Sequence, residues 1–269
     1  MNATLEPREV ERPFRKRWLR MTWQLFVRSP IRFGILIALL GWIDTTAVNL
    51  AYGFVVPRVW VDRVGMLCLP LLWVIVSAVA RGADDHRQTW TALHELTRWR
   101  LWSKALMPGA VLIACSIVIF FVLQILFDFP APAHPLAYSQ KPGALLQTVA
   151  AQSFILSVAF GICYAPLLVF WPQLSFKETE KLSRSASALN NRSQINWLII
   201  ALLGVGLPLE LVPTYGMGEA ALLVFMGALN YVAYRDIVER RDENLPAKAP
   251  ETAVPTTATA TVDIMQARS

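Results

Sequence analysis

Two groups of polar residues in this chain could do chemistry. Near the middle, Asp84, Asp85 and His86 are followed by His94 and Glu95, and these residue types can bind metal ions. On a helix, His86 and His94 would lie about two turns apart, which is too far for one tetrahedral ion. We therefore interpret the cluster as the solvated start of a helix, with the two aspartates at its positive end. A metal site is the alternative.

Asp44 is the second candidate because it falls inside an apolar stretch. An aspartate in hydrocarbon costs about 2.5 to 3.5 kcal/mol on insertion scales, so it needs a partner or a proton. Asn49 would share its helix side, while Gln152 and Arg63 could approach from other apolar segments. One interpretation is a buried hydrogen-bonded pair that orders the helices. The other is a proton or cation site of a transporter.

Motifs typical of soluble enzymes do not occur. The sequence contains no HExxH, no GxSxG and no phosphate-binding GxxxxGK[ST]. The three cysteines, Cys68, Cys115 and Cys163, are an odd number and lie in apolar stretches, which argues against a disulfide framework and a zinc site. We expect no catalytic residue, no metal ion and no cofactor.

The elements that would position these residues are apolar and long. Six segments come near the ~20 residues that a helix needs to cross a bilayer. The chain is 55% hydrophobic and 16% charged, whereas soluble domains are usually ~25% charged. We therefore expect an all-α, polytopic membrane protein with six transmembrane helices, at 33–56, 64–80, 105–127, 144–171, 195–212 and 217–234.

The basic residues predict the orientation of these helices. Of the 25 lysines and arginines, 22 lie in four segments that would share one side of the membrane, and only three lie in the other loops. Basic loops stay in the cytoplasm, so both termini should be cytoplasmic, in a bacterial inner membrane. Since this bias accounts for the net charge of +6, we expect no nucleic-acid partner. The four basic segments are 1–32, 81–104, 173–194 and 235–269.

Three amphipathic segments, 14–27, 88–104 and 176–192, precede apolar ones. In each, apolar residues recur at helical spacing beside basic or polar residues. Such helices lie in the headgroup layer, where tryptophan suits the boundary with hydrocarbon and arginine meets lipid phosphates. Membrane lipids, and a membrane-protein partner, are therefore the expected partners. The residues predicted to lie at the lipid interface are Trp18, Trp23, Arg17, Arg20, Trp99 and Trp102.

The order of surface helix, span, outer turn and span recurs three times. Residues 19–41 can be laid on 182–204, with the same five letters, IALLG, at 37–41 and at 200–204. This pattern predicts a three-fold repeat of helical hairpins. The chain would then comprise a basic cytoplasmic segment with an interfacial helix at 1–32, a six-span domain at 33–235, and a disordered cytoplasmic tail at 236–269.

Three short stretches carry a resemblance to a known family. WQLFVRSP at 23–30, YAPLLVF at 164–170 and LSRSASALNN at 182–191 resemble an uncharacterised family of six-span proteobacterial inner-membrane proteins. The resemblance covers roughly residues 14–235 and implies fold and location, but no chemistry. The chain departs from the family in its long outer turn at 130–142 and in its polar tail.

These observations favour a non-enzymatic integral inner-membrane protein that organises lipid or partner proteins. The alternative is a small proton- or cation-coupled transporter that uses Asp44. An intramembrane enzyme is a third possibility, and it would need a second polar group close to Asp44 or His94.

Overall fold

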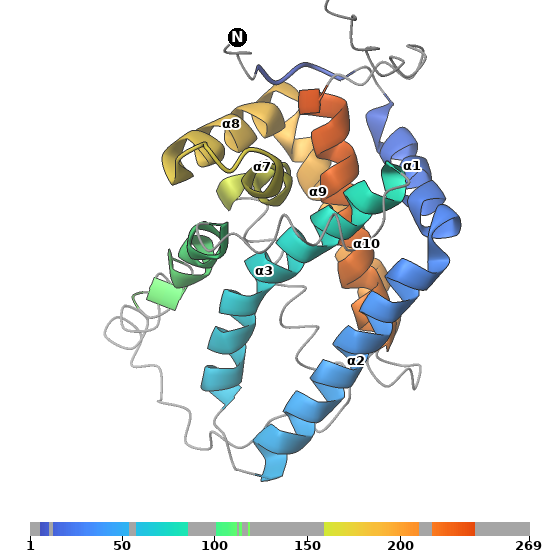
Figure 1. Ribbon diagram of the computed structural model, residues 1–269, viewed down its shortest axis with the longest axis vertical. Coiled ribbons are helices and arrows are strands. Elements are labelled where there is room, and N and C mark those ends of the chain that lie inside the picture. Colours follow the sequence, from blue (N-terminus) through green and yellow to red (C-terminus); the bar gives the residue numbers. More distant parts are fainter. Residues whose placement is uncertain are drawn as a thin grey trace, which may run out of the picture.

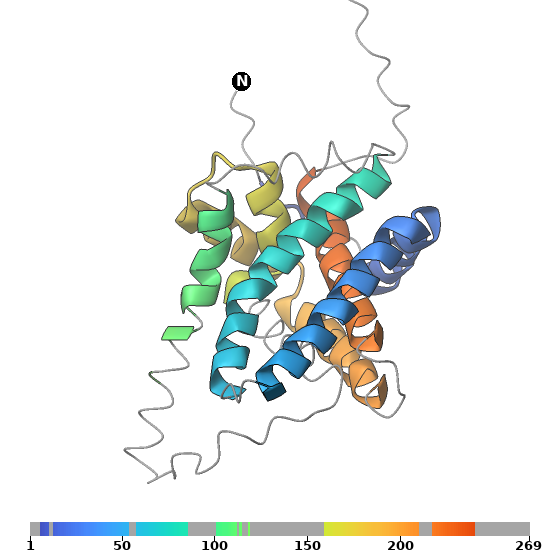
Figure 2. The same ribbon diagram turned by 60° about the horizontal axis from the view of Figure 1, so that its bottom comes forward.

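The computed structural model describes residues 6–10, 13–53, 58–85, 101–111, 113–114, 118, 159–209 and 217–239. Within these ranges every regular element is a helix, which confirms the all-α class (Figure 1). α10 (Met217–Tyr234) lies at the centre, because it contacts α1, α2, α3, α7 and α9. Figure 2 shows α2 and α3 running along one side of it.

α1 (Phe14–Arg28) and α2 (Pro30–Gly53) meet at a bend of 94°. Ser29 between them has a non-helical backbone, with φ −137° and ψ 57°. Proline causes this break, since it lacks an N–H and disfavours the helical conformation of the residue before it. The side of α1 that faces the protein is apolar, as its spacing predicts, and buries Phe14, Trp18, Thr22 and Leu25.

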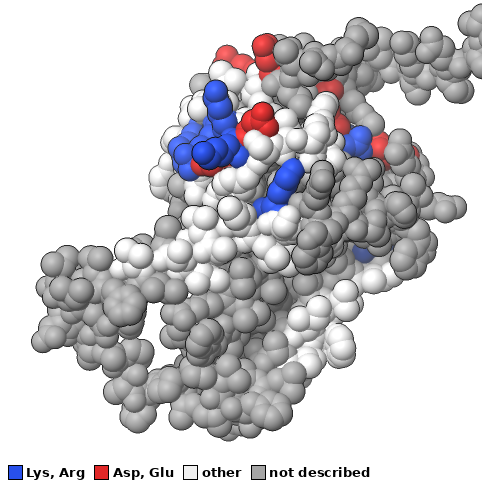
Figure 3. Space-filling model, turned by 60° about the vertical axis from the view of Figure 1, so that its left-hand side comes forward, with Lys and Arg blue, Asp and Glu red and all other residues white. Residues whose placement is uncertain are grey.

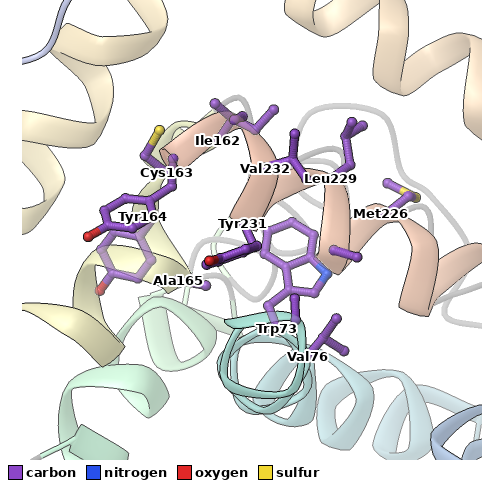
Figure 4. Packing of buried hydrophobic residues seen from close by; sticks show 14 of the residues in the cluster. Trp73, Val76, Ile162, Cys163, Tyr164, Ala165, Met226, Leu229, Tyr231 and Val232 are labelled. Atoms are coloured by element: carbon purple, nitrogen blue, oxygen red, sulfur yellow. The ribbon is translucent and has the colours of Figure 1, made fainter. Parts of the chain in front are cut away.

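α3 (Arg58–Asp84) packs closely against α10. A Cβ atom added to Gly227 would lie 2.8 Å from Cγ1 of Val76, so the absence of a side chain allows the close approach. Trp73, Met226 and Tyr231 surround this crossing (Figure 4). α3 extends beyond the predicted span 64–80 at both ends.

The predicted span 144–171 is not one continuous helix. Helical backbone reaches residue 160, stops, and resumes as α7 (Tyr164–Phe170). Gly161 causes the break: it has φ +84°, and a Cβ atom there would lie 2.5 Å from the carbonyl oxygen of Ser183. Only glycine meets both conditions without strain.

α8 (Phe176–Leu189) and α9 (Arg192–Leu209) follow after a short loop. α8 starts with a capping box, in which Ser175 and Glu178 each bond the other's backbone N–H. The pair α8–α9 repeats the order of α1–α2, an amphipathic helix, a short break and an apolar helix. In the second predicted unit, which begins with segment 88–104, the boundary between residues 104 and 105 falls inside continuous helix at 101–111.

Among the described residues, one helix is long and apolar enough to cross a membrane. It comprises α10 and its extension, Met217–Glu239, and most of it is buried inside the protein. The bent pair α1–α2 adds a second candidate if it is counted as one segment. The predicted spans 105–127 and 144–171 lie mostly outside the described residues, as do residues 240–269.

Candidate functional site

α10 ends in a π-helix, η2 (Arg235–Glu239). π-helical turns are rare in proteins overall, but many of those that occur lie at functional sites. The predicted disordered tail began at residue 236, but Ile237 and Val238 are buried, so that boundary is wrong. Side chains bonded around η2 form what we call the η2 network: Arg8, Arg17, Trp18, Arg81, Asp84, Asp85, Trp171, Tyr231, Tyr234, Arg235, Asp236 and Glu239.

Asp84 joins the end of α3 to α10 and η2. Arg235 Nη1 lies 2.7 and 2.8 Å from its two carboxylate oxygens, and Tyr231 Oη donates to Oδ2 at 2.9 Å. Only 6% of the Asp84 side chain is exposed. The prediction of a solvated helix start is therefore wrong here, because Asp84 is the last residue of α3. At the negative end of that helix, the arginine compensates an unfavourable charge.

Arg81 joins α3 to the end of η2. Its Nη1 atom lies 3.1 Å from Glu239 Oε1, and its Nε atom lies 3.5 Å from Asp85 Oδ2. The guanidinium also stacks 4.3 Å from the centre of the Phe170 ring. Burial works against its charge, but the carboxylate of Glu239 and other nearby groups hold the pKa of Arg81 above its ordinary value. The guanidinium therefore stays charged.

Tyr234 connects the end of α7 to the carboxylate of Glu239. Its hydroxyl donates to Glu239 Oε1 at 3.2 Å and accepts from Trp171 Nε1 at 2.9 Å. Trp171 directly follows α7. The short helix beyond the Gly161 break is thus tied to the end of α10.

Asp236 joins α1 to η2. Its carboxylate accepts from Arg17 Nη2, from Trp18 Nε1 at 2.7 Å and from Arg8 Nη2 at 3.2 Å. Trp18 is fully buried. The structure therefore corrects the prediction for this side chain: its indole lies in the core and bonds a carboxylate, instead of facing lipid.

The N-terminal segment 6–10 lies against both η2 and the end of α8. The backbone N–H of Arg8 donates to the carbonyl of Ile237 at 3.0 Å. Asn190 accepts from the Val10 N–H at 2.7 Å and donates to the Arg8 carbonyl at 2.9 Å. Residues 8–10 of the predicted N-terminal segment 1–32 therefore pack on the C-terminal helices.

The network is suited to holding helix ends together. It sets four arginines against four carboxylates, so its charges balance. Apart from the Arg81–Asp85 pair at the end of α3, the bonds of the network join different elements. Within the described ranges, no group of three or more His, Cys, Asp or Glu side chains is placed to hold a metal ion. The arrangement supports a structural task.

The predicted intramembrane site lies outside what the structure describes. Asp44 and Asn49 belong to α2 and Arg63 belongs to α3, but their side chains are not among the described ones, and Gln152 is outside the described residues. That site stays a prediction.

The other five predicted lipid-interface residues divide into three groups. Trp23 is 63% exposed, and Arg20 is exposed as well. Arg17 is partly exposed but bonds Asp236, while Trp102 is half-buried. Trp99 lies outside the described residues.

Sequence reasoning missed the η2 network, although a signal was present. Arg81, Asp84 and Asp85 follow one predicted span, and Arg235, Asp236 and Glu239 follow another, on what should be the same side of the membrane. Two mixed-charge sets at neighbouring helix ends can pair with each other. Pairing them required knowing that α3 and α10 are neighbours.

Fold and site together define an all-α protein whose helix ends are joined by a buried, charge-balanced network. Comparison of the chain with protein-family models, with curated proteins and with solved structures finds no match in any of the three.

Proposed function

We propose that this is an integral protein of a bacterial inner membrane, with six transmembrane helices and cytoplasmic termini, that organises lipid or partner proteins without catalysis. The observation that carries the proposal is the outer side of α2. Ile31, Ile35, Leu39 and Trp42 recur there at helical spacing, and they are 48 to 76% exposed. Water-soluble proteins rarely expose so long an apolar stripe, whereas hydrocarbon accommodates it.

The distribution of charge supports the same proposal. The η2 network holds its carboxylates inside the protein, while large apolar side chains lie outside on α2 and α9. On the face in Figure 3, the described charged side chains gather mostly towards one end. This pattern fits a bundle whose charged end meets water and whose apolar sides meet lipid.

The contact between residues 8 and 237 supports an even number of crossings. The two residues are hydrogen-bonded, so they lie on one side of any membrane that the chain spans. Six helices and two cytoplasmic termini satisfy this condition. The resemblance to six-span inner-membrane proteins agrees with it.

Fractionation tests the membrane proposal. The full chain, expressed in bacteria, should stay in the membrane pellet after washing with alkaline carbonate, because its apolar stripe is held by hydrocarbon. Release into the supernatant would contradict the proposal. Recovery of lipids and proteins with the chain in mild detergent then tests the organising role, which requires a reproducible set of either.

The transporter alternative rests on Asp44. It follows Trp42 and Ile43 in α2, whose side chains are exposed and apolar. A charged group beside such lipid-facing residues is costly, so its presence there favours a function. Asp44→Asn should abolish a proton-coupled flux in proteoliposomes while leaving the amount of folded protein unchanged. Asp62→Asn, near the predicted outer end of the next span, is the control. Loss of folded protein in Asp44→Asn alone would instead favour a structural pair.

A further inference from the structure

We propose that the outer face of α1 binds the headgroups of anionic phospholipids. We define this face by Lys16, Arg20, Trp23 and Val27, which lie opposite the buried residues Phe14, Trp18, Thr22 and Leu25. The inference rests on the proposed membrane function. It adds the class of lipid and the surface that selects it.

The charge on α1 is uncompensated along the helix. Its sequence, FRKRWLRMTWQLFVR, has five basic residues and no acidic one. Arg17 forms an ion pair with Asp236, whereas Lys16 and Arg20 are exposed and lie one turn apart. The outer face therefore presents a pair of adjacent cations to an anion.

α8 provides a contrast within the same fold. It also exposes two basic residues one turn apart, Lys177 and Lys181. However, Glu178 and Glu180 accompany them, and Glu180 pairs with Arg184. α8 is therefore an internal reference for a basic helix whose charge is largely balanced.

The second half of the α1 face is apolar. Trp23 and Val27 are 63% and 62% exposed, and Ile31 and Ile35 of α2, beyond the bend, are exposed as well. From Lys16 to Ile35 the exposed side chains named here thus change from cationic to aromatic to aliphatic. A phospholipid changes in the same order, from its phosphate to the interface to its acyl chain.

The bend sets the direction of this face. With α2 crossing the bilayer, a turn of 94° lays α1 along the membrane surface. Lys16 and Arg20 then lie at the level of the phosphates, and the exposed indole of Trp23 lies at the headgroup boundary. An acidic protein or a nucleic acid would leave Trp23 and Val27 without a counterpart, so lipid is the partner that matches the whole face.

The test is a titration of phosphatidylglycerol or phosphatidylcholine into the full chain in mild detergent, with binding read by native mass spectrometry. In Lys16→Gln/Arg20→Gln the apparent Kd for phosphatidylglycerol should rise roughly 30-fold, since each cation near an anionic surface contributes about fivefold. The Kd for phosphatidylcholine should not change. Lys177→Gln/Lys181→Gln is the matched control and should bind both lipids as the unmodified chain does.

A second variant separates the two halves of the face. Trp23→Ala should weaken binding of both lipids by the same factor, because an indole contacts either lipid in the same way. Equal binding by Lys16→Gln/Arg20→Gln and the unmodified chain would overturn the inference, as would an equal loss in both charge variants. Either result would leave the membrane proposal intact if the chain still resisted carbonate, whereas release by carbonate would defeat the membrane proposal itself.

Discussion

The carboxylate of Asp236 accepts bonds from three side chains that come from the first 18 residues of the chain. It is the point at which the N-terminal segment, α1 and η2 meet. A carboxylate so enclosed depends on its donors, because a charge withdrawn from water is stable only while it is paired and hydrogen-bonded.

Asp236→Asn should therefore lower the free energy of unfolding strongly. Removing one member of a buried ion pair costs about 3 to 5 kcal/mol, and we expect about 3 kcal/mol here because Arg8 and Arg17 are partly exposed. Thermal unfolding in detergent measures the change. Glu180→Gln, which removes the partner of the exposed Arg184, is the control and should cost less than about 1 kcal/mol. Equal losses in the two variants would contradict the role of Asp236.

Glu178 should make the start of α8 sensitive to acid. Hydrogen bonds with the Ser175 side chain and backbone lower the pKa of Glu178 below its ordinary value of 4.5. A carboxyl group with a lowered folded pKa stabilises the helix fully above the unfolded pKa and loses that contribution as pH falls through the folded one. Amide protection in the first turn of α8 should therefore drop below pH 4.5.

Hydrogen exchange, corrected for intrinsic rates, measures this loss. Glu178→Gln supplies the control, because glutamine can keep the capping bond but does not titrate in this range. The acid-dependent drop in α8 should vanish in that variant. If it persists unchanged, another group is responsible.

At the scale of elements, α3 and α10 cross closely at Gly227. Gly227→Ala should lower the free energy of unfolding by about 1 to 3 kcal/mol, since the added methyl would press on the Cγ1 and Cβ atoms of Val76. Thermal unfolding in detergent checks this expectation. Val76→Ala in the same chain should restore part of the loss by making room. A further loss in the double variant would show that the crossing is looser than the structure has it.

The sequence predicts the helices that are determined by residues close together in the chain. It does not predict the breaks that depend on distant residues. Apolar periodicity suffices to predict a surface helix at 14–27 and an apolar helix after it. Pro30 explains the bend between α1 and α2 once the structure is known. The break at Gly161 depends on the carbonyl of Ser183, which is distant in sequence. A glycine inside an apolar run does not by itself indicate a positive φ.

The η2 network could not be predicted from the sequence either, because its interacting residues are distant in the chain. The polar residues from 236 onwards are typical of a disordered tail. The carboxylate of Asp236 is bonded by Arg8, Arg17 and Trp18, which come from near the N-terminus. From the sequence, the residues of the candidate site can be recognised as charges at helix ends, but the pairs that they form cannot.

At the scale of the whole molecule, the joined ends predict the topology. Reporter fusions before residue 1 and after residue 269 should both report the cytoplasm, because the segments next to them meet through Arg8 and Ile237 and the basic loops are retained inside. A fusion within the predicted outer turn 130–142 is the control and should report the opposite side. Termini on different sides would contradict both the orientation and the even number of crossings.

The bond between Arg8 and Asp236 spans 228 positions of the chain. During synthesis, the segment that carries Arg8 must therefore wait until residue 236 has left the ribosome before it finds its carboxylate. A product that stops short of residue 236 lacks that anchor and leaves Arg8, Arg17 and Trp18 unsatisfied. A copy truncated before residue 236 should therefore be less stable than the full chain, and its N-terminal segment should be more accessible to proteases.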